Sequence, residues 1–97
     1  MSYVDFQINS IKSVEAIQLD NIVEVNASFY RGNYQNVKNS ITNEIENSYV
    51  RTEKFESAII IFIPSDATEQ EINEQLYDLL LEYKKPNDEV IPECIYQ

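Results

Sequence analysis

The stretch SAIIIFI, residues Ser57–Ile63, decides the fold of this chain because it is apolar on both faces of a strand. Its four isoleucines and one phenylalanine are β-branched or aromatic residues, which favour strands. A strand without a polar face is expected at the centre of a sheet, covered on at least one side by helices. Pro64 ends the strand, since proline cannot donate a hydrogen bond to a neighbouring strand.

Upstream of this stretch, the first third of the chain has the pattern of further strands. Residues 3–9 alternate apolar and polar side chains, as a strand with one buried face does. A second extended segment, 13–19, is followed by Asp20 and Asn21, two residues that suit a tight turn. Residues 22–30 alternate cleanly, with the apolar side chains at odd positions. These segments predict an antiparallel sheet with one dry face and one wet face.

Two helices are expected to pack on this sheet. Residues 33–50 carry apolar side chains at spacings of three and four, with Asn33 as the N-cap. The apolar residues of this pattern are Tyr34, Val37, Ile41, Ile45 and Tyr49. A second helix is expected over 67–85, because Thr68 and Glu71 form a capping-box pattern and Pro86 follows the last turn.

The expected element order is therefore β-β(-β)-α-β-α-(β) within a single α+β domain, residues 1–97. Its simplest packing is a mainly antiparallel sheet of three to five strands with two helices on one face. The tail, 89–97, is expected to be extended, and Pro92 limits it to an edge strand. If the tail joins the sheet, it can complete a right-handed parallel crossover.

Composition excludes most catalytic chemistry. The chain has 17 acidic and 7 basic residues, a net charge of −10, and no histidine. Without histidine and with a single cysteine, no tetrahedral zinc site and no Ser/His or Cys/His pair can form. A single glycine leaves no phosphate-binding loop. The sequence therefore predicts no catalytic residues, no cofactor and no bound metal, and a protein that is not an enzyme.

Charge and the N-terminal sequence also indicate partners and compartment. The acidic excess repels nucleic acid and anionic membranes and attracts basic surfaces. Residues 1–5 lack the features of a signal peptide, and the longest apolar run is too short to span a bilayer. With Cys94 as the lone cysteine, we expect a reducing cytoplasm, bacterial or that of an infected host cell.

A stripe of carboxylates marks the expected second helix. Glu71, Glu74, Asp78 and Glu82 follow one another at spacings of three and four, so neighbouring side chains lie about 5–6 Å apart. No lysine or arginine occurs between Glu71 and Glu82, and the first basic residue at the same spacing is Lys85. We call these four residues the acidic stripe. It is either the ordinary solvated face of a helix or a binding face for basic residues of a partner.

Tyr77 and Leu81 are expected on the same helix, away from its apolar side. A pair at this spacing on a surface often has no role, or it covers a neighbouring element such as the tail. The functional interpretation is an apolar anchor beside the acidic stripe, because interfaces favour an aromatic centre with a charged rim.

Two hypotheses follow. The first is a small acidic protein-binding module that inhibits or antagonises another protein by occupying its basic surface, in the manner of nucleic-acid mimics, phage counter-defence proteins or immunity proteins. Its partner-binding residues would be the acidic stripe with Tyr77 and Leu81. The alternative is a structural or assembly subunit that self-associates, as a homodimer or a larger assembly, and whose acidic surface serves solubility.

Overall fold

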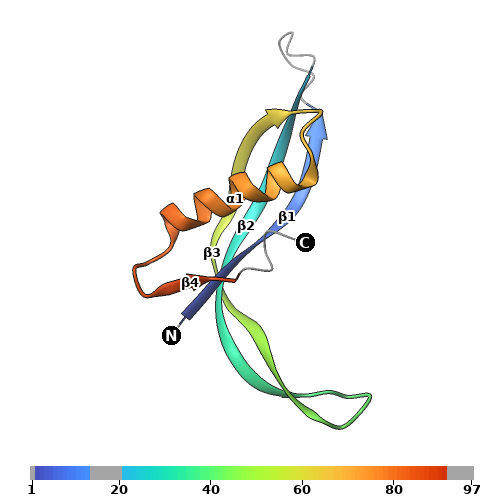
Figure 1. Ribbon diagram of the computed structural model, residues 1–97, viewed down its shortest axis with the longest axis vertical. Coiled ribbons are helices and arrows are strands. Elements are labelled where there is room, and N and C mark those ends of the chain that lie inside the picture. Colours follow the sequence, from blue (N-terminus) through green and yellow to red (C-terminus); the bar gives the residue numbers. More distant parts are fainter. Residues whose placement is uncertain (1, 14–20, 92–97) are drawn as a thin grey trace.

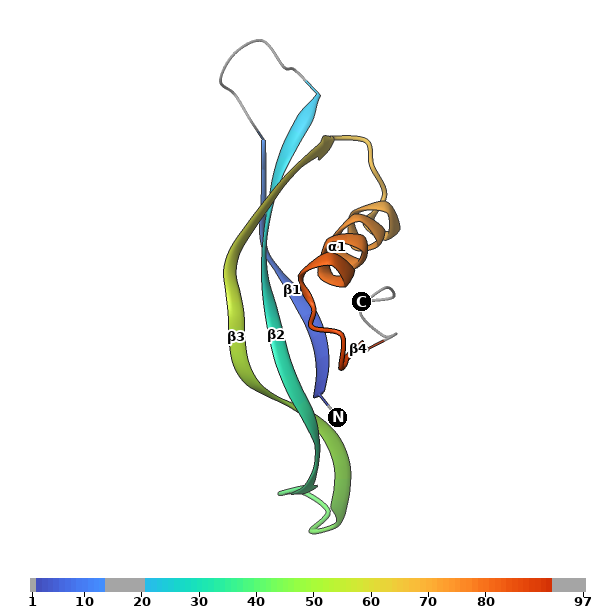
Figure 2. The same ribbon diagram turned by 90° about the vertical axis from the view of Figure 1, so that its left-hand side faces the viewer.

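One helix lies across one face of a long, curved sheet (Figures 1 and 2). The computed structural model describes residues 2–13 and 21–91. The elements are β1 (Ser2–Ser13), β2 (Ile22–Lys38), β3 (Ile45–Pro64), α1 (Glu69–Tyr83) and β4 (Asp88–Val90). The sheet order is β3-β2-β1-β4; β4 pairs with β1 in parallel, and the other two pairings are antiparallel. The expected strand 13–19, apart from Ser13, and the tail beyond Ile91 lie outside the described residues.

β2 and β3 form one long hairpin, whose outer part extends beyond the rest of the sheet. Their pairing runs from Ile22 opposite Pro64 to Lys38 opposite Ile45. At this end of the sheet the pairing of β1 with β2 stops at Tyr3, which lies opposite Gly32. Residues 33–50 therefore project as a two-stranded arm, seen at the bottom of Figure 1. We call this segment the hairpin arm.

The prediction of a helix over 33–50 is wrong. The prediction of two helices packed on a mainly antiparallel sheet is therefore wrong as well. The fold keeps the α+β class, with a single helix and a mixed four-stranded sheet. A helix here would need its apolar stripe buried, because its Asn, Ser and Gln residues are weak helix formers. Instead Ile41 and Ile45 remain 91% and 72% exposed.

Local turn chemistry explains the hairpin. The Asn39 side-chain oxygen accepts hydrogen bonds from the backbone N–H groups of Ile41 and Thr42, and Asn43 adopts a positive φ of 61°. Asparagine favours both features, which reverse the chain direction instead of starting a helix. At the base of the arm, the ring of Tyr34 meets those of Tyr3 and Tyr49 at centroid distances of 4.9 and 5.9 Å.

The expected central position of Ser57–Ile63 is also wrong. These residues form the end of β3, which is an edge strand of the sheet. Ile59 and Ile63 point into the core, whereas Ile60 and Phe62 lie on the opposite face, 48% and 61% exposed. A strand with the pattern of a central strand thus occupies the edge.

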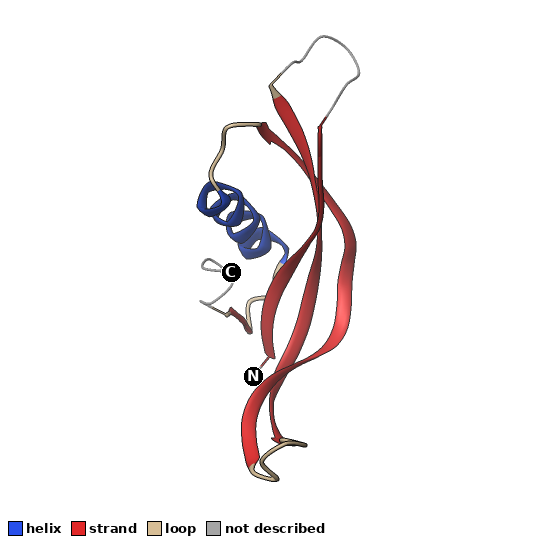
Figure 3. Cartoon of the chain, turned by 90° about the vertical axis from the view of Figure 1, so that its right-hand side faces the viewer, coloured by secondary structure: helices blue, strands red, loops and turns tan. Residues whose placement is uncertain are grey.

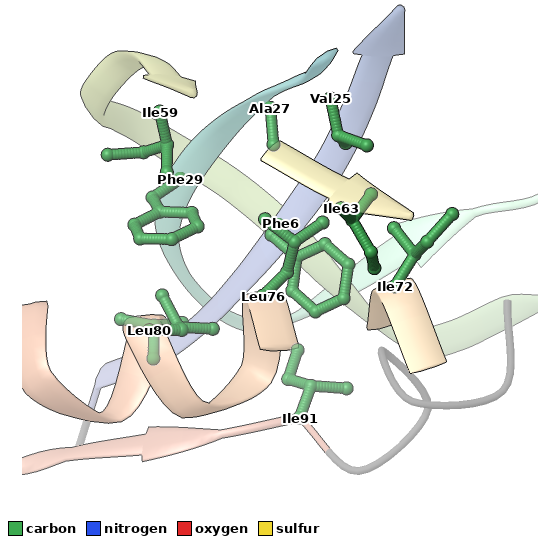
Figure 4. Close-up of a cluster of buried hydrophobic side chains, with 11 residues drawn as sticks. Phe6, Val25, Ala27, Phe29, Ile59, Ile63, Ile72, Leu76, Leu80 and Ile91 are labelled. Carbon is green, nitrogen blue, oxygen red and sulfur yellow. The ribbon is translucent and has the colours of Figure 1, made fainter. Parts of the chain in front are cut away.

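The core lies between α1 and one face of the sheet (Figures 3 and 4). Each strand contributes alternate residues to this face, and α1 contributes its one apolar side. The cluster consists of Val4, Phe6, Val25, Ala27, Phe29, Ile59, Ile63, Ile72, Leu76, Leu80 and Ile91.

Gly32 is buried at the point where the hairpin leaves the sheet. A Cβ atom placed there would lie 2.1 Å from the carbonyl oxygen of Val50 and 2.9 Å from its carbonyl carbon. Both atoms belong to backbone, so the neighbouring strand would have to shift. Only glycine allows the two strands to approach this closely.

We expect Gly32→Ala to lower the free energy of unfolding by about 1–3 kcal/mol, the usual result of inserting an atom into a packed site. Urea denaturation followed by far-UV circular dichroism measures the change. Ser40→Ala, in the exposed turn of the arm, is the control and should stay within about 0.5 kcal/mol of the parent chain. An unchanged urea midpoint for Gly32→Ala would contradict the close approach.

Candidate protein-binding surface

α1 is defined by its caps and its single apolar side. The hydroxyl oxygen of Thr68, the N-cap, accepts a hydrogen bond from the backbone N–H of Glu71 at 3.2 Å. The helix ends where the N–H of Lys84 bonds to the carbonyl of Leu80. It begins and ends within the expected range 67–85. Its sequence EQEINEQLYDLLLEY contains five acidic residues and no basic residue.

The acidic stripe faces away from the sheet. The buried residues of α1 are Ile72, Asn73, Leu76 and Leu80. At about 100° per residue, the acidic stripe is centred about 180° from this buried line. All four of its side chains are exposed. Since α1 forms a separate layer on the sheet (Figure 2), this outer side meets solvent.

The two apolar residues expected beside the stripe differ in exposure. Leu81 is exposed, whereas Tyr77 is half-buried and packs against the core cluster. Tyr77 was expected away from the apolar side because the apolar residues Leu79 and Tyr83 shift the predicted centre of that side away from it. Because Asn73 is buried, the centre of the buried side lies closer to Tyr77, and Tyr77 therefore lies at the margin of the core.

Both arginines form ion pairs with carboxylates of the sheet strands. Arg31 donates to both oxygens of Asp88 at 3.0–3.3 Å and to Glu53 at 3.1 Å. Its guanidinium also lies 4.5 Å from the centre of the Phe55 ring. Such planar, bidentate contacts are the strongest ion pairs that arginine makes.

Arg51 forms the second network, on the sheet face opposite α1. Its Nε donates to Asp5 at 2.8 Å and its Nη1 to Gln7 at 2.9 Å. The Tyr49 hydroxyl donates to the other oxygen of Asp5 at 2.9 Å. Arg51 also lies 4.2 Å above the ring of Tyr30. Buried Asp5 is therefore compensated on both oxygens.

These networks leave the acidic stripe without intramolecular cations. Within residues 2–13 and 21–91, the ion pairs join Arg31 and Arg51 to Asp5, Glu53 and Asp88, and none reaches α1. Lys84 also points elsewhere, donating to the carbonyl of Asp88 at 3.2 Å. Neither Asp5 nor Asp88 was predicted to be buried, since nothing in the local sequence pattern marks either residue.

The negative charge of Asp88 contributes to the stability of the folded state. Burial raises the pKa of its carboxyl, but the hydrogen bonds from Arg31 and from the backbone N–H of Lys85 outweigh burial and hold it below the ordinary value. A carboxyl with a lowered pKa stabilises the fold fully above its unfolded pKa of about 3.9. This stabilisation is lost as the pH falls through the folded pKa.

We expect Asp88→Asn to destabilise the fold at neutral pH by about 1–3 kcal/mol, since a buried charge-assisted hydrogen-bond network is weakened. The difference from the parent chain should shrink as the pH falls from about 6 to about 2.5, because protonation removes the same charge from the parent. Urea denaturation across this pH range measures it. Asp78→Asn, on the exposed stripe, is the control. A pH-independent difference for Asp88→Asn would contradict the assignment.

Other kinds of site have little support in the described residues. A hollow of about 590 Å³ is lined by Ser2, Pro86, Asn87, Asp88 and Glu89, and Arg31 holds its buried carboxylate. Across residues 2–13 and 21–91 there is no group of three His, Cys, Asp or Glu side chains placed to bind a metal. No helix in this part of the chain has the length and apolarity needed to cross a membrane.

The chain was also compared with known proteins. A scan against protein-family models, a search of curated proteins and a search of solved structures each found no match. Function therefore has to be inferred from the geometry.

Proposed function

We propose that this protein is a small binding module that acts by occupying a basic surface of another protein. One observation carries the proposal: the outer side of α1 presents four exposed carboxylates, while both arginines are held by other acids. Glu74 accepts a hydrogen bond from Gln70 at 3.2 Å, but no cation among the described residues pairs with the stripe, so its charges remain available to external cations. Like charges on neighbouring helix turns repel by a few tenths of a kcal/mol per pair, which a basic partner would relieve.

The target is proposed to be a surface that normally binds nucleic acid. Successive carboxylates of the stripe are about 5–6 Å apart. Phosphates follow one DNA strand at a rise of about 3.4 Å along the axis, with a somewhat longer through-space repeat. Arginine and lysine side chains arranged for phosphates can therefore meet the stripe. The protein would act as a competitor, in the manner of a phage counter-defence inhibitor or an immunity protein.

Electrostatic and apolar contacts would have separate roles. The stripe steers the approach of the basic partner and fixes its orientation. Leu81, with the exposed part of Tyr77, supplies apolar contact beside the charges. The proposal involves no catalysis, no cofactor and no direct contact with nucleic acid or membrane. It places the protein in a reducing cytoplasm, of a bacterium or an infected host cell.

The test compares two variants of equal charge and composition. One neutralises the acidic stripe (Glu71→Gln, Glu74→Gln, Asp78→Asn and Glu82→Gln). The control neutralises four exposed acids elsewhere (Glu44→Gln, Glu46→Gln, Glu56→Gln and Asp66→Asn). Each is used to capture proteins from host lysate, and the affinity for the captured partner is then measured by calorimetry.

We expect the stripe variant to bind the partner at least about tenfold more weakly than the control variant does. Raising the salt from about 0.05 M to about 0.5 M should weaken binding of the parent chain, since screening shortens the range of charge attraction. Equal binding by both variants, or binding that is indifferent to salt, would overturn the proposal.

A second candidate function, self-assembly, is favoured by a different observation. β3 ends in an exposed apolar edge, which a partner strand could cover. This edge is independent of the acidic stripe.

A further inference from the structure

The end of β3 combines two properties that do not fit a free edge strand. Residues 59–63 are all apolar, and β3 lies at the edge of the sheet. Ile60 and Phe62 are 48% and 61% exposed on the face that α1 does not cover. An exposed, apolar edge strand is a template for pairing with another chain. We refer to residues 59–63 as the β3 edge.

The middle of β3, residues 51–56, is protected against such pairing. The pairing with β2 shifts register between Ala27 and Phe29, between Phe29 and Tyr30 and again between Arg31 and Gly32, and each shift places an extra residue in β3. The same region of β3 carries the charged residues Arg51, Glu53, Lys54 and Glu56. Bulges and charges are the usual means by which edge strands avoid each other.

The β3 edge has neither protection. From Ile59 opposite Ala27 to Pro64 opposite Ile22, the pairing is regular, one residue to one. No charged residue occurs between Ser57 and Pro64. The contrast with residues 51–56 indicates that this stretch, and not the middle of β3, is the part that pairs.

We propose that the β3 edge pairs antiparallel with the β3 edge of a second copy, so that two four-stranded sheets become one continuous sheet. This inference deepens the second candidate function, self-assembly, and does not depend on the acidic stripe. A twofold axis perpendicular to the sheet keeps the same face of both copies on the same side. Because side chains alternate between faces, an even-numbered residue must then lie opposite an even-numbered residue, and an odd-numbered residue opposite an odd-numbered one. With Ile61 opposite its own counterpart, Ile60 lies opposite Phe62 of the second copy, and Phe62 opposite Ile60.

This register is favoured by the side chains that it brings together. Each exposed isoleucine meets an exposed phenylalanine, and β-branched–aromatic pairs stabilise neighbouring strands. A register centred on Ile60 would instead place Glu56 opposite Pro64 within the paired segment. The register centred on Ile61 leaves the charged residues 51–56 outside it.

A second copy suits this edge better than a basic partner does, because the edge is uncharged and self-complementary. Each copy carries a net charge of −10, so the two repel at long range. Salt screens this repulsion and should strengthen the dimer. Salt should weaken capture of a basic partner, so the two interactions respond in opposite directions.

The first experiment measures self-association by sedimentation velocity over a range of protein and salt concentrations. We expect a reversible dimer that becomes tighter with salt. Ile60→Lys and Phe62→Lys should each weaken it about tenfold or more, because every substitution occurs twice in the dimer. Ile41→Lys, at the exposed tip of the hairpin arm, adds the same charge elsewhere and should not weaken the dimer.

A second experiment tests the register without relying on the lysine variants. In a chain with Cys94→Ser, the Ile61→Cys variant should form a disulfide-linked dimer on mild oxidation, since opposite residues lie within reach of a disulfide. A mixture of Ile60→Cys and Phe62→Cys chains should form the mixed dimer. Intact mass spectrometry identifies the products, and Ile41→Cys is the control.

Three results would overturn the inference. The parent chain could remain monomeric at high protein and salt concentration. The lysine variants at the β3 edge could dimerise as tightly as Ile41→Lys, which would place the contact elsewhere. Disulfide formation at the β3 edge could be no faster than at Ile41, which would leave the edge free or assign it to a different protein.

Discussion

The packing of a single helix on a single face of the sheet is the constraint on which the rest of this structure depends. Leu76 and Leu80 are fully buried against the sheet, and their contacts with residues such as Phe6 and Phe29 hold α1 in place. Because α1 has one apolar side, its carboxylates must face outward. Because one helix covers one face, the other face of the sheet has to be stabilised by polar contacts, which Arg51 and Asp5 provide. Burial thus determines where both kinds of charge lie.

The sequence predicted those elements whose local pattern agrees with their tertiary role. The alternation of residues 22–30 corresponds to part of β2, and the Thr68–Glu71 pattern corresponds to the observed cap of α1. The hairpin arm shows why the remainder failed. Its apolar residues happen to recur at helical spacing, but no surface is available to bury them, whereas Asn39 and Asn43 stabilise a turn. For Ser57–Ile63, the pattern correctly indicated a strand but wrongly predicted a central position, because the local sequence does not show that β3 lies at the edge of the sheet.

The candidate surface was predicted in outline because helix periodicity alone places four carboxylates on one side. The orientation of Tyr77 was not predicted, because it depends on the burial of Asn73. A hydropathy pattern assigns this polar residue to the surface. The networks around Asp5 and Asp88 were beyond sequence reasoning for a different reason. Asp5 and Arg51 are 46 residues apart, and Arg31 and Asp88 are 57 apart, so their meeting depends on strand pairing and register. Register in turn depends on the bulges of β3 and on the close approach at Gly32.

The acidic stripe and the β3 edge can act together, because they occupy different parts of the molecule. α1 lies on one face of the sheet, and the β3 edge lies at one lateral edge of the sheet (Figure 2). A twofold axis perpendicular to a continuous sheet would keep both copies of α1 on the same face. The dimer would then present two acidic stripes in one direction. A partner with an extended or twofold basic surface, as nucleic-acid-binding proteins often have, could engage both stripes, and the second contact would form at a high effective concentration. Self-association through an uncharged edge would in this way strengthen binding through a charged helix without any new contact.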